Sequence, residues 1–186
     1  MTESTTAHYP VLNRDSASEL AQPILENVQK AFGKIPNAIG TMANAPLTLK
    51  SYAEIGANFA KAGFRPVEQQ IIFLAVSVEN ECAYCIAAHS TALKTNFKVA
   101  ASVVDAIRAK TPTGDTKYDA LIATVRAMVQ NKGYLPDETR SAFLDAGYSP
   151  TQLIDLLSAI AMKTITNYFD HLTRIELDDD FKAEAK

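Results

Sequence analysis

The chain has 186 residues, of which 47% are hydrophobic, and its 18 basic and 21 acidic residues give a net charge of −3. This composition predicts one soluble domain, spanning residues 1–186, with a sizeable apolar core. So small a net charge excludes strong electrostatic attraction to nucleic acid or to a membrane surface. The longest strongly apolar run, residues 71–78, is far shorter than the roughly 20 residues that span a bilayer, so we expect no membrane segment. Residues 1–20 form a polar leader without the pattern of a signal peptide, which predicts a cytoplasmic protein.

Hydrophobic spacing and the positions of proline and glycine predict an all-α fold. Helices are expected over residues 22–32, 46–63, 66–79, 82–96, 98–110, 115–133, 136–146 and 150–172. The apolar run at 71–78 alone would also fit a buried strand, but the absence of turn residues between 66 and 79 favours a helix. Residues 34–37 are expected to be a connector. The charged residues 176–186 are expected to form a frayed tail.

The last predicted helix, residues 150–172, is apolar over more than the single stripe that a surface helix needs. A subunit interface would explain this pattern, and so would a central position in the core. The sequence leaves both interpretations open.

The only two cysteines, Cys82 and Cys85, lie within one four-residue window. In a reducing compartment such a pair indicates redox or metal chemistry rather than a structural disulfide. If the segment is helical, Cys82, Cys85 and His89 lie at i, i+3 and i+7 and share one face. A pair at the start of a helix can form a disulfide, and the helix dipole there stabilises a thiolate.

The spacing also assigns roles. His89 is one helical turn after Cys85 and could take its proton or stabilise its thiolate, which makes Cys85 the expected nucleophile. Cys82, nearer the helix end and expected to be more accessible, would be the resolving cysteine. Two alternative interpretations are that the pair consists of small core residues and that the three side chains hold zinc. A structural zinc site needs four ligands, so we expect neither a metal nor another cofactor. His171 is expected to be a surface or hydrogen-bonded histidine.

Residues 67–89, together with Pro36-Asn37 and Ala45-Pro46 upstream, resemble the core of the AhpD-like alkylhydroperoxidases of the carboxymuconolactone decarboxylase superfamily. The resemblance covers roughly residues 30–110, the motif-bearing core. It implies an all-helical AhpD-like fold assembled into homotrimers or homohexamers. It also implies a peroxidase that reduces organic hydroperoxides, with Cys85 as the peroxidatic and Cys82 as the resolving cysteine. A dithiol of lipoyl type or a thioredoxin-like protein would restore the pair.

One position departs from the family pattern. His89 matches the family histidine that relays the proton together with a glutamate twelve residues before the first cysteine. Gln70 stands at that position here, and an amide accepts no proton at neutral pH. Glu79, three residues before Cys82, is the expected substitute base; the alternative is an ordinary surface carboxylate at a helix end.

The leading hypothesis is therefore a thiol-dependent peroxidase. A disulfide reductase or electron-relay protein with little peroxidase activity is the second, since Gln70 replaces the relay acid. A lactone decarboxylase is less favoured, because those relatives are expected to lack the cysteine pair. A redox sensor without turnover is also compatible with the motif. The sequence leaves the hydroperoxide, the electron donor and the number of subunits open.

Overall fold

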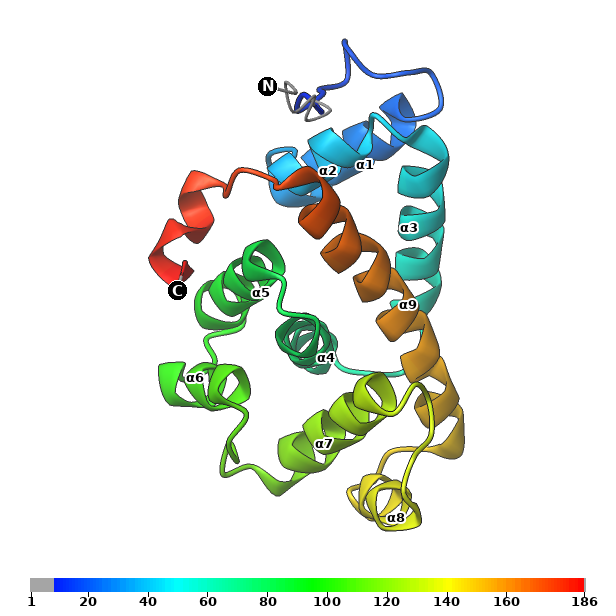
Figure 1. Cartoon of the computed structure of the whole chain (residues 1–186), viewed down its shortest axis with the longest axis vertical. Helices are drawn as coiled ribbons and strands as arrows, with labels where there is room; N and C mark the ends of the chain where they lie inside the picture. The colour runs from blue at the N-terminus through cyan, green and yellow to red at the C-terminus, as the bar shows by residue number, and fades with distance from the viewer. Residues whose placement is uncertain (1–8, 186) are drawn as a thin grey trace, which may run out of the picture.

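The computed structural model describes residues 9–185, and helices make up most of this part of the chain (Figure 1). In chain order the elements are α1 (Gln22–Phe32), α2 (Asn37–Met42), α3 (Pro46–Phe59), α4 (Pro66–Glu79), α5 (Ala83–Thr95), α6 (Ala101–Ala109), α7 (Thr116–Gln130), α8 (Asp137–Asp145), α9 (Pro150–Thr173) and the 3-10 helix η1 (Asp179–Glu184). No strand occurs within residues 9–185. The all-α prediction is confirmed, and the expected helices begin and end close to these bounds.

Helix α4 lies at the centre of the fold, with α5, α6, α7 and α9 packed around it (Figure 1). All eight residues from Ile71 to Val78 are buried. A helix that is apolar on every side must be covered on every side, which explains both its central position and why its sequence resembles a strand. Pro66 occupies its first turn, and the Glu68 carboxylate caps its start by accepting hydrogen bonds from the backbone N–H and the guanidinium of Arg65.

Helix α9 packs along α3 on one side and against α4 on another (Figure 1). At the α3 contact, a Cβ on Gly56 would lie 3.1 Å from Sδ of Met162, so glycine allows the two helices this close approach. The opposite side of α9 leaves Ile154, Leu157 and Leu172 exposed. Helix α9 is therefore a core helix with an uncovered apolar side. None of the described helices is long and apolar enough to cross a membrane.

The connector expected at residues 34–37 ends in a short helix, α2, that was not predicted. Its six residues are too few to show helical periodicity. The backbone N–H of Leu12 donates to the Gly40 carbonyl at 3.0 Å, which ties the later part of the polar leader to α2. A Cβ on Gly40 would lie 2.8 Å from the Leu12 carbonyl oxygen, so only glycine fits there. Residues 1–8 of the expected leader lie outside the described residues.

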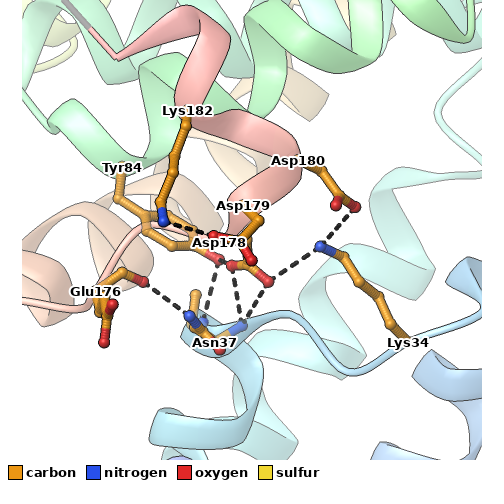
Figure 2. Close-up of polar contacts among 9 residues, drawn as sticks. Lys34, Asn37, Tyr84, Glu176, Asp178, Asp179, Asp180 and Lys182 are labelled. Atoms are coloured by element: carbon orange, nitrogen blue, oxygen red, sulfur yellow. Dashed lines mark hydrogen bonds and ion pairs between the residues drawn. The ribbon is translucent and has the colours of Figure 1, made fainter.

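The C-terminal segment is not a frayed tail, contrary to expectation. It turns back and places η1 against α5 (Figure 1). Figure 2 shows Asp178, which is 7% exposed, accepting hydrogen bonds from the Tyr84 hydroxyl and the Asn37 backbone, while Lys34 Nζ lies 3.1 Å from its Oδ1. At the other end of the segment, Glu184 forms ion pairs of 2.9 Å with Lys94 and Arg108. Charges that suggest a solvated end are thus paired with earlier parts of the chain.

Candidate active site

The two cysteines lie at the start of α5, as the spacing predicts. Glu81 adopts a left-handed conformation with φ 58°, which turns the chain between α4 and α5. Cys82 is the N-cap of α5, and its Sγ accepts a hydrogen bond of 3.3 Å from the backbone N–H of Cys85. Neither cysteine is in a disulfide. The reduced pair therefore sits at the positive end of the helix dipole.

The greater accessibility expected of Cys82 is not observed. Both cysteines are buried, Cys82 fully and Cys85 with 5% of its surface exposed. The C-terminal segment provides the cover, because Ile175, Leu177 and Phe181 pack on the cluster that contains both cysteines. A helix start that looks free in the sequence is closed by residues more than eighty positions later.

Helix α9 supplies three polar side chains to this site that the sequence analysis missed. Lys163, Asn167 and Asp170 follow one another at i, i+4 and i+7, so they share one face of the helix, and their exposed fractions are 2%, 0% and 8%. The Cys82 thiol lies 3.2 Å from Oδ2 of Asp170. The Asn167 amide donates to the Ser77 hydroxyl at 3.3 Å and accepts from the Asn80 side chain at 2.9 Å. Buried polar groups are costly unless they are paired, and here Asp170 pairs with Cys82 while Lys163 pairs with His89.

The environment separates the proton affinities of the two thiols. The hydrogen bond from Cys82, followed by the positive charge of Lys163 and the hydrogen bond from Asn167, lowers the pKa of Cys85 to about 6 despite burial. The same bond to Cys85, together with burial, raises the pKa of Cys82. Cys85 is thus the thiolate and Cys82 the thiol. The single proton of Cys82 has two acceptors within reach, the Cys85 sulfur and the Asp170 carboxylate.

His89 is held between Gln70 and Lys163 rather than against a sulfur. Its Nδ1 is 2.9 Å from Oε1 of Gln70, and its Nε2 is 2.8 Å from Nζ of Lys163. An ammonium only donates, so Nε2 accepts and Nδ1 donates to the amide oxygen. Burial and the Lys163 charge hold the pKa of His89 well below its usual value. Both ring nitrogens of His89 therefore have a hydrogen-bond partner other than a cysteine sulfur.

The expected substitute base lies elsewhere. The Gln70 side chain is hydrogen-bonded to His89, as its position in the family pattern implies. The Glu79 side chain is directed to α6 and α7, where it contacts Lys110, Arg126 and Gln130. The charge of Glu79 is thus paired with cations of α6 and α7. The carboxylate that contacts a cysteine is that of Asp170. His171 is exposed and lies beside Tyr168, as expected of a surface histidine.

Within the described residues, no group of three or more His, Cys, Asp or Glu side chains is arranged to hold a metal ion. The chemistry that this arrangement can perform is that of a thiolate, a neighbouring thiol, a buried ammonium and a carboxylate.

The family model of the carboxymuconolactone decarboxylase family matches residues 46–117. Among solved structures, the chain is similar to an alkylhydroperoxidase AhpD core, an uncharacterized peroxidase-related protein from Ralstonia eutropha JMP134, with a TM-score of 0.83 and 19% identity over 95% of this chain and 94% of that one. No curated protein sequence matches the chain.

Two further proteins have solved structures of similar fold. An uncharacterized peroxidase-related protein from Silicibacter sp. TM1040 has a TM-score of 0.77 and 17% identity over 97% of both chains. The debrominase Bmp8 has the same TM-score, with 19% identity over 97% of both chains; a variant of it in complex with 2,3,4-tribromopyrrole is similar too. At these identities the likeness establishes the fold. Together with the family match, it confirms the AhpD-like resemblance.

Proposed function

We propose that this AhpD-like chain is a thiol-dependent peroxidase that reduces organic hydroperoxides through a dithiol–disulfide cycle of Cys85 and Cys82. The observation that carries the proposal is the division of protons between the two sulfurs. A nucleophilic thiolate stands beside a thiol that keeps its proton until it is needed. Two inert core cysteines would show no such arrangement of a cation, an amide and a carboxylate around them.

In the first step, the Cys85 thiolate attacks the terminal oxygen of the hydroperoxide. An S–O bond forms and the O–O bond breaks, so that Cys85 becomes a sulfenic acid and the electron pair leaves with the alkoxide. The alkoxide takes a proton and departs as an alcohol. Lys163, whose charge acts on Cys85, is the cation placed to stabilise the developing alkoxide and to donate that proton.

In the second step, Cys82 resolves the sulfenic acid. Its thiol proton passes to Asp170, whose Oδ2 is 3.2 Å from the sulfur, and the resulting thiolate attacks the Cys85 sulfur. The disulfide forms as hydroxide leaves and takes a proton to become water. An external dithiol, of lipoyl type or thioredoxin-like according to the family resemblance, then supplies two electrons and two protons to restore the pair.

A second candidate function is a disulfide reductase or electron relay with little peroxidase activity. The observation that favours it is Gln70, which binds His89 where the family pattern has an acid. A relay without that acid moves protons more slowly, whereas thiol–disulfide exchange at Cys85 needs only its thiolate.

Serine variants of each cysteine test the proposal. Cys85→Ser should consume no cumene hydroperoxide. Cys82→Ser should consume one equivalent and then stop with a sulfenic acid on Cys85, which dimedone traps and mass spectrometry locates. Equal and undiminished turnover in both variants would overturn the proposal. Disulfide exchange without peroxide consumption in the unaltered protein would favour the second candidate.

A further inference from the structure

A groove of about 880 Å³ lies between α1 and α3 and ends at Met162 of α9. Its walls include Ile24, Val28 and Phe32 of α1 and Ala53 and Ala57 of α3. Phe32 is 69% exposed, an unusual state for so large an apolar side chain. Pockets that hold organic ligands are concave, mostly apolar and of this size.

The groove has no unpaired charge among its lining residues, which favours an uncharged ligand. Lys50 and Glu54, both on α3, are the charged residues among those that line it, and they form an ion pair with each other. Neither is free to attract an ionic group, and the remaining lining is apolar apart from Asn27 and Tyr52. Transfer of a charged ligand into such a groove would be unfavourable, whereas an apolar body gains free energy from burial.

The inner end of the groove adjoins the redox site. Met162 directly precedes Lys163 in α9, so the floor of the groove and the activating cation are neighbours in the chain. Tyr52 of α3 also lines the groove. Burial raises the pKa of Tyr52, and the charges of Lys163 and Cys85 both act on it. The groove and the redox site are thus linked by Met162–Lys163 in α9 and by Tyr52 in α3.

We propose that this groove binds the organic body of the substrate, and that the substrate is a neutral hydroperoxide with an apolar body of about ten or more non-hydrogen atoms. Tyr52 then guides the peroxide end toward Cys85. The inference rests on the proposed function for the reaction but not for the binding. The debrominase Bmp8, a solved structure of similar fold, has a variant in complex with the small organic molecule 2,3,4-tribromopyrrole.

Groove-filling variants test binding without any chemistry. Ala57→Phe adds a ring from α3, and Val28→Trp adds one from α1, so one remains if the other misfolds. Ala142→Phe makes the same change at an exposed position of α8 and serves as the control. The probe is 2-phenyl-2-propanol, the alcohol formed from cumene hydroperoxide. We expect saturable binding by NMR titration in the unaltered protein and in the control, and at least tenfold weaker binding in both groove variants.

Kinetics with two peroxides provide the second readout. Both groove variants should raise KM for cumene hydroperoxide about tenfold, while the rate at which hydrogen peroxide oxidises Cys85 stays within twofold. Equal losses with both peroxides, or no loss with either, would overturn the inference. So would groove variants that change the oligomeric state but not alcohol binding, since the groove would then be a contact between copies. Alcohol binding lost in the groove variants, with no peroxide consumed by any protein, would support the groove and reject the peroxidase.

Discussion

The ammonium group of Lys163 lies 2.8 Å from Nε2 of His89 in the interior of the protein. Burial and the repulsion from this ammonium both lower the pKa of His89, so its ring stays neutral. A neutral imidazole carries no positive charge, and its Nε2 accepts a hydrogen bond from Lys163. In the family pattern the histidine is the relay residue; here the positive charge next to the nucleophile comes from α9.

Replacing Lys163 with methionine should raise the pKa of Cys85 above about 6, because it removes a charge that favours the thiolate. A nearby opposite charge typically lowers a pKa by about one to three, so reactivity near pH 7 should fall roughly tenfold or more. The loss should disappear at alkaline pH, where the thiol ionises without help. The measurement is the rate of iodoacetamide alkylation of Cys85 against pH, with the modified residue located by mass spectrometry.

His89→Gln is the matched comparison for Lys163→Met. A neutral imidazole contributes no charge, so this variant should shift the alkylation midpoint less than Lys163→Met does. A shift as large as that of the lysine variant would show that His89 is the activating group and that the charge assignment is wrong.

Asp170→Asn should separate the two halves of the cycle. The amide keeps the shape of the side chain but cannot take the Cys82 proton. Removing a negative charge that raises the pKa of Cys85 leaves the first step intact or slightly faster, whereas disulfide formation slows by about 10²-fold or more, as for the loss of a general base. Dimedone trapping over time should reveal an accumulating sulfenic acid. Unchanged resolution would remove Asp170 from the mechanism.

The C-terminal segment should contribute measurably to stability through Tyr84. Its hydroxyl donates to the buried Asp178 and accepts from the backbone N–H of Ala38 at 3.2 Å. Tyr84→Phe leaves these groups without that partner and should cost about 1–3 kcal/mol in the free energy of unfolding. Denaturant titration measures the loss. Tyr134→Phe, at a side chain 83% exposed, should change nothing; equal effects in the two variants would contradict the structural role of Tyr84.

The sequence predicts much of this fold because residues that favour helix ends mark where several helices begin. Pro46, Pro66 and Pro150 each occupy the first turn of a helix, and proline is compatible with a helix only there. The cysteine pair lies at a helix start, as predicted, because the helix that it begins has local signals in the sequence.

The rest of the site depends on contacts that are distant in sequence. Helix α9 was interpreted from its apolar residues, although the i, i+4, i+7 spacing of Lys163, Asn167 and Asp170 was a visible signal of a polar face inside a core helix. The tail looked solvated because the partners of Asp178 lie far away: Tyr84 is 94 residues earlier and Lys34 is 144. No local pattern reports such pairs.

Stoichiometry in a single turnover tests the central claim most directly. The fully reduced protein is mixed with one equivalent of cumene hydroperoxide, and peroxide and free thiols are counted before and after. The account predicts that one peroxide disappears as both thiols of the chain, Cys82 and Cys85, are lost together. Peroxide that persists while the thiols exchange rapidly with an added disulfide would contradict it and identify the chain as a reductase or relay.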